Sequence, residues 1–250
     1  MTESIPKTRF LSIILMLSII FLCLQLNAQT KSSDKRIKEI IDYSNEVYGP
    51  DDLLVNGELY TKSFLRAKSH PFFLDNKWSK GKLFIKEKCY DNIEIRIDVE
   101  TDALILKAKT KIHEYPLRLN QKMIDSFYIQ NSFFINSTHL NLEKNYSSRA
   151  YVELVYHGNF KSIIQYEKSF VASFTNTTPY GYYSQLGSDI YISKDGKLYY
   201  VSTKKRLLQF FKPYKNEINK YLRIQKINYK KMNSQELHNL FKYCDEISSV

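Results

Sequence analysis

The chain has 250 residues and a formal net charge of +11, and it contains three cysteines. No segment repeats at a fixed period and no Gly/Ser-rich or Pro-rich linker divides the chain, which excludes a repeat architecture and domains joined by such a linker. The cysteines form no pair at zinc-ligand spacing, and the length is ample for one domain with its own hydrophobic core.

The N-terminus has the three-part layout of a secretory signal peptide. Lys7 and Arg9 precede an apolar run from Phe10 to Leu24, and a short polar segment then leads to Ala28. A membrane-spanning helix needs about 20 apolar residues, and this run is shorter. We therefore expect cleavage near Ala28, no transmembrane helix in the mature chain, and a periplasmic, extracellular or cell-surface location.

Two alternatives to cleavage remain open. The segment could stay in place as an uncleaved N-terminal anchor, or the chain could be lipidated at Cys23. The second alternative is less favoured because Leu22 occupies the position where a lipoprotein signal needs a small residue.

The first elements of the mature chain are an amphipathic helix and a mixed segment. Ile37, Ile40 and Val47 recur near the helical period within residues 31–48, and the pattern stops at Gly49 and Pro50. Residues 51–78 show no clear period, so we expect a loop with a short strand and a short helix there.

From residue 82 the pattern changes to the period of two that half-buried strands show. Ile93, Ile95 and Ile97 alternate with charged residues, and Leu104 and Leu106 continue the pattern after a charged turn. These residues predict two antiparallel strands.

Two β-hairpins are predicted further along the chain. Residues 151–156 lead through a turn into residues 160–166, and residues 189–193 lead through Asp195 and Gly196 into residues 197–201. The Asp-Gly turn gives the stronger signal, because glycine adopts the positive φ that tight hairpin turns require.

Helical spacing returns after residue 203. Leu207 to Phe211 form one apolar cluster, Pro213 is suited to the start of the next helix, and Asn233 with Glu236 forms a capping box before the last one.

These elements together predict an α+β fold. Its main part is an antiparallel sheet, curved or sandwich-like, with an N-terminal helix and C-terminal helices. We expect residues 29–250 to form a single globular domain that is β-rich over residues 82–202 and helical and basic over residues 204–248.

Positive charge gathers in the C-terminal helices. Residues 204–231 carry ten basic side chains and one acid, Glu217. Such a face could attract anionic envelope lipid, acidic polysaccharide or another envelope protein, and salt would weaken the attraction. The alternative is a solvated helix surface. Nucleic acid is not an expected partner, since no recognition motif is present. The candidate contact residues are Lys204, Lys205, Arg206, Lys212, Lys215, Lys220 and Arg223.

A second candidate site is the tyrosine-rich loop of residues 176–187. Tyr180, Tyr182 and Tyr183 stand among turn residues between two predicted strands, and tyrosine offers both a flat apolar face and a hydroxyl group to a ligand. The chain contains 20 tyrosines, so a chance cluster or a loop packed over the core is favoured over a binding platform.

Cys89 and Cys244 are the two cysteines that remain after signal cleavage. In an oxidising compartment they could form a disulfide that ties the last helix to an early strand. Two buried thiols that pack as small apolar side chains are the alternative.

No catalytic, metal or cofactor site is predicted. Asp98, Glu100 and Asp102 resemble the start of a calcium loop, but the glycine and the final bidentate acid of that motif are missing, so a polar hairpin turn is favoured. The five histidines form no metal-ligand pair, and no nucleophile elbow, phosphate loop or dinucleotide fingerprint occurs.

Four short features resemble secreted proteins of Bacteroidota-type bacteria to which no activity is assigned. The features are Ala28 followed by Gln29, Asn56 followed by Gly57, Trp78 near Gly81, and the run from Ser202 to Phe210 before a basic helix. The resemblance implies an exported, β-rich envelope protein and transfers no functional residue.

The leading hypothesis is a non-catalytic exported envelope protein that binds a ligand or a partner. The alternative is a carrier or sensor that holds an apolar, lipid-like ligand in a cavity lined by the sheet. A hydrolase with an unrecognised site is the third hypothesis, because catalytic groups can converge from distant segments.

Overall fold

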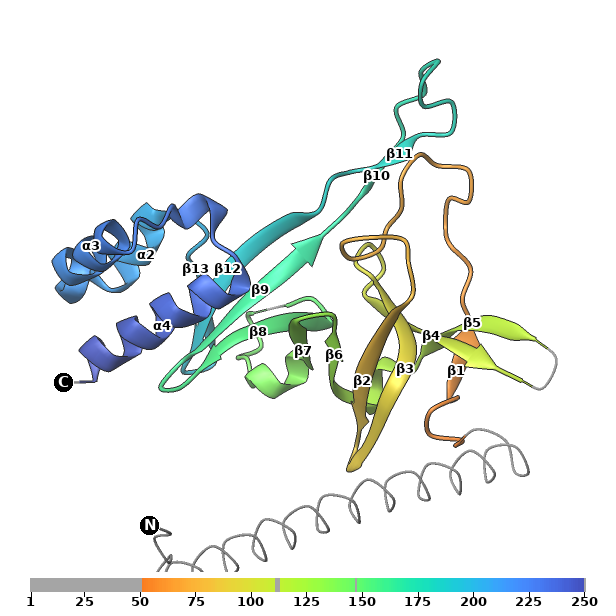
Figure 1. The fold of residues 1–250 in the computed structure, drawn as a ribbon, viewed down its shortest axis with the longest axis horizontal. Coiled ribbons are helices and arrows are strands. Elements are labelled where there is room, and N and C mark those ends of the chain that lie inside the picture. Colours follow the sequence, from red (N-terminus) through yellow and green to blue (C-terminus); the bar gives the residue numbers. More distant parts are fainter. Residues whose placement is uncertain (1–50, 111–112, 147, 250) are drawn as a thin grey trace, which may run out of the picture. The chain divides into compact units, whose positions relative to one another are not determined.

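A computed structural model of the chain describes residues 51–110, 113–146 and 148–249 (Figure 1). These residues belong almost entirely to one compact unit, Asp52–Val250. The predicted signal peptide and the predicted N-terminal helix lie outside the described residues.

The predicted antiparallel sheet is confirmed. In the described part of the chain, eleven strands join in one sheet in the order β1-β5-β4-β3-β2-β6-β7-β8-β9-β12-β13, and every neighbouring pair is antiparallel. The strands are β1 (Gly57–Leu59), β2 (Ser79–Ile85), β3 (Lys88–Asp98), β4 (Ala103–Lys109), β5 (Glu114–Leu119), β6 (Ile124–Ile129), β7 (Ser132–Asn136), β8 (Tyr151–His157), β9 (Lys161–Glu167), β12 (Gly187–Lys194) and β13 (Lys197–Tyr200). A separate two-stranded ribbon pairs β10 (Phe170–Val171) with β11 (Tyr182–Tyr183).

The sheet consists of two meanders joined at β2. Strands β2 to β5 follow one another as hairpins, and β6 then returns to pair with the free side of β2. From there β7, β8, β9, β12 and β13 extend the sheet in chain order. The three hairpins expected from the sequence are present as β3–β4, β8–β9 and β12–β13.

The sheet curves back on itself rather than forming two layers of a sandwich. Four strands separate β8 from β4, yet the residues just before β8 contact the turn between β3 and β4. The Ala150 N–H donates to Asp102 Oδ2 at 3.3 Å, and Arg149 Nη1 donates to the Val99 carbonyl oxygen at 2.7 Å. Buried side chains from β2 to β8 fill the resulting concave face, among them Leu83 and Phe127.

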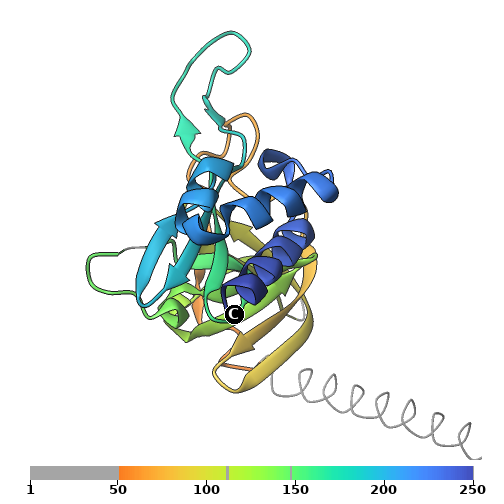
Figure 2. The ribbon, with the colours of Figure 1, turned by 90° about the vertical axis from the view of Figure 1, so that its left-hand side faces the viewer.

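The predicted C-terminal helices are confirmed as α2 (Lys204–Phe210), α3 (Lys215–Ile224) and α4 (Ser234–Ser248) (Figure 2). Short 3-10 turns connect or precede several elements, at η1 (Gln121–Met123), η2 (Ser137–Leu140), η3 (Lys212–Tyr214) and η4 (Tyr229–Lys231). The predicted capping box is present, since the Asn233 side chain accepts from the Glu236 N–H at 2.9 Å and Glu236 accepts from the Asn233 N–H at 3.0 Å. Pro213 stands inside η3, directly before α3.

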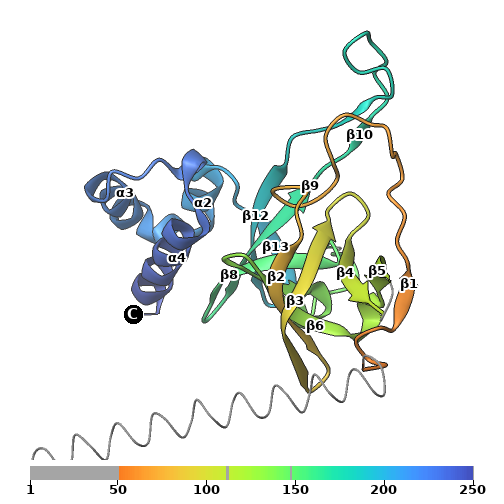
Figure 3. The same cartoon turned by 45° about the vertical axis from the view of Figure 1, so that its right-hand side comes forward.

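The helices pack as a layer on one face of β8, β9 and β12 (Figure 3). Leu207, Leu222 and Phe241 from the three helices meet Ile164 and Ile192 from the sheet in a second hydrophobic core. This layer holds the basic helical surface and the residues around Asp245 that are described below.

Residues 51–78 depart from the prediction, because the structure shows the short strand β1 but no helix among them. The chain instead runs along the end of β3, where the Phe73 N–H donates to the Ile97 carbonyl oxygen at 2.9 Å. Ser69 and Leu74 adopt φ values of 64° and 54°, which interrupt any helical run. The prediction of a short helix here was therefore wrong. Burial of Phe72 and Phe73 against the sheet stabilises the observed course of the chain more than a short isolated helix would.

Candidate functional site

The basic residues predicted as surface contacts all lie on α2, η3 and α3 of the helical layer. Each of the seven is exposed, while Leu207, Ile218 and Leu222 on the same helices are buried. We call this surface the basic face; it comprises Lys204, Lys205, Arg206, Lys212, Lys215, Lys220 and Arg223.

No ion pair within the described part of the chain involves a residue of the basic face. Its only ring contact there is that of Arg206, whose guanidinium carbon lies 4.8 Å from the Tyr200 ring centroid. The positive charge is therefore available to an external anionic partner.

Local helix energetics do not explain the charge at α2. Lys204, Lys205 and Arg206 occupy the first turn of this helix, which contains no acid. The helix dipole places partial positive charge at that end, so cations there are unfavourable by about 0.3–1 kcal/mol each at low ionic strength. Arg206 gains its contact with the Tyr200 ring, whereas no such contact accounts for Lys204 and Lys205 in the described part of the chain, which makes a functional reason for these two lysines worth testing.

The three candidate tyrosines of the 176–187 loop do not share one exposed surface. Tyr183 is buried at 3% exposure, and its ring lies 5.8 Å from that of Phe170, whereas Tyr180 is 50% exposed with the Arg66 guanidinium 5.4 Å from its ring centroid. Tyr182 is partly buried in the β11 strand. The structure thus gives Tyr183 a packing role and leaves Tyr180 as the tyrosine accessible to a ligand.

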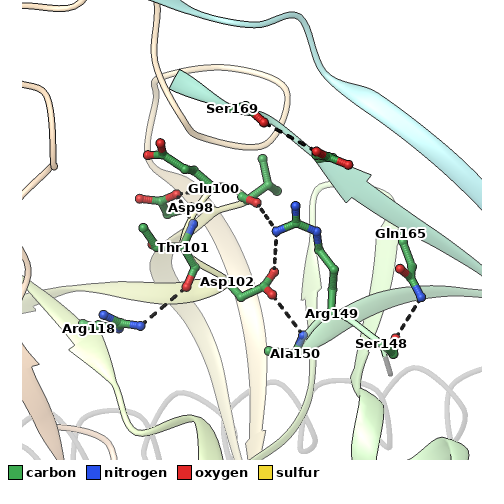
Figure 4. A network of polar contacts seen from close by, with 12 residues as sticks. Asp98, Glu100, Thr101, Asp102, Arg118, Ser148, Arg149, Ala150, Gln165 and Ser169 are labelled. Carbon is green, nitrogen blue, oxygen red and sulfur yellow. Dashed lines mark hydrogen bonds and ion pairs between the residues drawn. The ribbon is translucent and has the colours of Figure 1, made fainter. Parts of the chain in front are cut away.

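The acidic residues of the β3–β4 turn form a structural network, as the sequence favoured (Figure 4). Asp98 Oδ1 accepts from the backbone N–H groups of Glu100 and Thr101 at 2.9 and 3.1 Å, and Oδ2 accepts from the Tyr60 hydroxyl at 2.6 Å. Burial and the hydrogen bond to Asp98 raise the pKa of Tyr60 far above its usual value.

Asp102 completes this network from the other side of the turn. Its carboxylate contacts Arg149 Nη1 at 3.3 Å and the Ala150 N–H, so it ties β8 to the turn. Within the described ranges, no group of three His, Cys, Asp or Glu side chains could hold a metal ion.

A pocket of about 700 Å³ opens beside the end of α4, next to the β8–β9 turn. Asp245 lines it and is only 5% exposed. Its Oδ2 accepts from the Tyr156 hydroxyl at 2.8 Å and the Asn159 N–H at 2.9 Å, and its Oδ1 accepts from Asn159 Nδ2 at 3.0 Å. Gly158 makes this approach feasible, because a Cβ there would overlap both the Asp245 carboxylate and the Tyr156 hydroxyl.

The electrostatics of Asp245 keep it ionised. Burial alone would raise its pKa, but hydrogen bonds from Asn159 and Tyr156, together with the charge of Lys194, outweigh burial and lower the pKa. Asp245 and Asn159 are 86 residues apart, so no spacing in the sequence indicates this site. The Gly158-Asn159 turn was visible in the sequence only as part of a hairpin.

Cys89 and Cys244 are both free thiols, so the structure does not contain the disulfide considered from the sequence. Cys89 is exposed at the beginning of β3, whereas Cys244 is buried in α4 among the residues of the helical core. Burial raises the pKa of Cys244 to about 12, which makes it an unreactive packing residue.

No protein-family model, curated protein or solved structure matches the chain. The resemblance to secreted Bacteroidota-type proteins stays a prediction. None of the helices in the described residues is long and apolar enough to cross a membrane.

Proposed function

We propose that this protein is a non-catalytic, exported envelope protein that binds an anionic surface through its basic face. One observation carries the proposal: seven basic side chains are exposed on neighbouring helices, and no ion pair in the described chain neutralises them. The chemistry sought in the partner is a dense array of phosphate or carboxylate groups. Lipid and acidic polysaccharide of the envelope both present such an array.

The strength of the interaction can be estimated from the charge. A basic residue that reaches an anionic membrane surface contributes about 1 kcal/mol. If four residues of the basic face make contact together, the gain is about 4 kcal/mol, or close to a thousandfold in affinity. The Debye length falls from about 10 Å at 0.1 M salt to about 3 Å at 1 M, so binding of this type is lost at high salt.

The alternative of an apolar-ligand carrier has less support. The concave face of the sheet is filled by side chains such as Leu83, Ile95 and Phe127, which have no exposed surface. The pocket of about 700 Å³ beside α4 lies instead at the ends of elements and has polar residues in its lining.

The test is cosedimentation of the protein with anionic and neutral vesicles, at low and at high salt. A basic-face variant replaces Lys204, Lys205, Arg206, Lys212 and Lys215 by glutamine. The control variant replaces five exposed lysines elsewhere by glutamine, namely Lys77, Lys80, Lys86, Lys122 and Lys144. Both variants lose the same net charge.

We expect the wild type and the control to bind anionic vesicles at low salt, and the basic-face variant to bind at least tenfold more weakly. An equal loss of vesicle binding in the basic-face variant and the control variant would show that only the total charge matters. It would reject the basic face as the binding surface. Salt-insensitive binding would reject the electrostatic mechanism.

A further inference from the structure

The pocket beside Asp245 has two chemically different walls. One wall is polar and includes Asn159, Lys194 and Ser249, and the other is formed by Phe210, Pro213 and Tyr214. Its volume of about 700 Å³ lies within the range of about 300–1,000 Å³ found for small-molecule sites.

One buried group, the Asp245 carboxylate, anchors part of the polar wall. Asp245 fixes the β8–β9 turn through Asn159, and Asn159 Nδ2 also donates to Ser249 Oγ at 2.8 Å. The side-chain amide oxygen of Asn159 takes part in none of these three hydrogen bonds. Lys194 lies close enough to lower the pKa of Asp245 through its charge, and its own side chain is exposed at the pocket. The wall thus offers the Asn159 side chain, which Asp245 holds in place, and an exposed cationic donor, Lys194.

The aromatic wall is fixed by ring contacts. The Phe210 ring lies 4.8 Å from the Phe211 ring and 4.9 Å from the Tyr199 ring, and Phe211 is itself buried against Phe160. Tyr214 closes this wall and is partly exposed. Rigid aromatic rings provide a flat apolar surface at little cost in conformational entropy.

The same chain segment builds the pocket and part of the basic face. Phe210, Pro213 and Tyr214 line the pocket, and the exposed Lys212 and Lys215 alternate with them along residues 210–215. A ligand in the pocket therefore meets the positive charges of these lysines and of Lys194 together with the negative charge of Asp245, whose carboxylate is 5% exposed and already accepts three hydrogen bonds.

We propose that this pocket binds one sugar ring of an acidic polysaccharide, while the basic face holds the neighbouring charged units of the chain. A pyranose ring has an apolar C–H face, which suits the aromatic wall, and hydroxyl groups that both donate and accept, which suit Asn159, Ser249 and Lys194. A carboxylate or sulfate on the ring pairs with Lys194. The inference rests on the proposed function and narrows its partner from an anionic surface to a saccharide.

A lipid acyl chain fits this pocket less well than a sugar does. An alkyl chain would desolvate Lys194 and the side-chain oxygen of Asn159 without replacing their hydrogen bonds to water, which is unfavourable for both groups and most of all for the charged ammonium. A saccharide hydroxyl restores those bonds. The mixed character of the walls therefore favours a sugar.

The test measures binding of three probes to the purified protein by calorimetry: an acidic trisaccharide of galacturonic acid, the neutral trisaccharide of galactose, and phosphatidylglycerol vesicles. The pocket variants are Tyr214→Ala and Lys194→Ala. Lys194 is exposed, so its removal leaves the fold intact even if Tyr214→Ala does not. The matched aromatic control is Tyr180→Ala, because Tyr180 is exposed and lies in the 176–187 loop, outside the pocket lining.

We expect the acidic trisaccharide to bind the wild type and the Tyr180→Ala control, and each pocket variant to bind it at least tenfold more weakly, with vesicle binding changed less than twofold. A short trisaccharide engages few residues of the basic face, so the pocket decides its affinity. Changes in the NMR chemical shifts of Asn159 and Ser249 on addition of the trisaccharide would show that the trisaccharide binds in the pocket.

Three outcomes would overturn the inference: absence of acidic trisaccharide binding, equal binding of the neutral trisaccharide, or unchanged binding in both pocket variants. Vesicle binding that survives in any of these cases would leave the proposed function standing.

Discussion

Replacement of Asp245 by asparagine tests the most heavily buried charge beside the pocket. The carboxylate is 5% exposed and accepts three hydrogen bonds, two from Asn159 and one from Tyr156. Asparagine keeps one carbonyl oxygen as an acceptor. Its NH2 group replaces the other carboxylate oxygen and then faces a hydrogen-bond donor of Asn159 or Tyr156. A hydrogen bond to a charged group contributes about 1.5–3 kcal/mol, and neighbouring bonds are not additive, so we expect a loss of about 3 kcal/mol.

The loss of stability caused by Asp245→Asn should become smaller at low pH. The pKa of Asp245 is lowered in the folded protein from the unfolded value of about 3.9, so its contribution to stability is complete above that value. The contribution disappears as the pH falls through the folded pKa. The wild-type and Asp245→Asn proteins should therefore differ by a constant amount from pH 8 to about pH 5, and the difference should shrink below about pH 4.

Urea unfolding followed by circular dichroism measures this difference at each pH, and thermal unfolding should show a shift of about 6–12 °C. The matched control is Glu246→Gln, which removes the neighbouring charge from an exposed position on α4. We expect it to change stability by less than about 0.5 kcal/mol. A difference for Asp245→Asn that stays constant down to pH 2, or an equal effect in Glu246→Gln, would refute the reasoning.

Three further predictions follow from local contacts. The Arg96 guanidinium lies 3.9 Å from the ring centroid of Trp78, the only tryptophan of the chain. Arg96→Lys should therefore lower the free energy of unfolding by about 1–2 kcal/mol and shift the tryptophan fluorescence emission. Unchanged emission would reject the stacking role of Arg96. Asn233→Ala removes the cap of α4 and should lower stability by about 1 kcal/mol in urea, whereas Asn233→Asp should preserve it. A thiol reagent should label Cys89 in the native protein and Cys244 only after unfolding, as peptide mapping by mass spectrometry can show; native labelling of Cys244 would contradict its burial.

The sequence predicts those strands, turns and helix ends whose pattern lies within a few neighbouring residues. The hairpin β12–β13 follows from alternating residues on either side of Asp195 and Gly196, and Gly196 adopts the positive φ of 72° that the turn requires. The start of α4 follows from Asn233 and Glu236, because both partners of a capping box lie within four residues.

The parts that could not be predicted depend on distant contacts. The return of β6 to β2 and the course of residues 60–78 over β3 are set by burial of residues such as Phe72 and Phe127, and burial has no local signature. The pocket was missed for the same reason, since Asp245 of α4 meets Asn159 of the β8–β9 turn, 86 residues away in the chain. The basic face was found because its residues are close in sequence.

The central claim is that the basic face touches an anionic surface, and a lysine-labelling footprint tests it most directly. The protein is acetylated briefly with and without anionic vesicles or acidic polysaccharide, and the rate of modification is read at each lysine by mass spectrometry. We predict that a bound anionic surface protects Lys212, Lys215 and Lys220, while Lys77 and Lys122, which are also exposed, react at unchanged rates. Uniform protection, or protection of Lys77 and Lys122 instead, would contradict it.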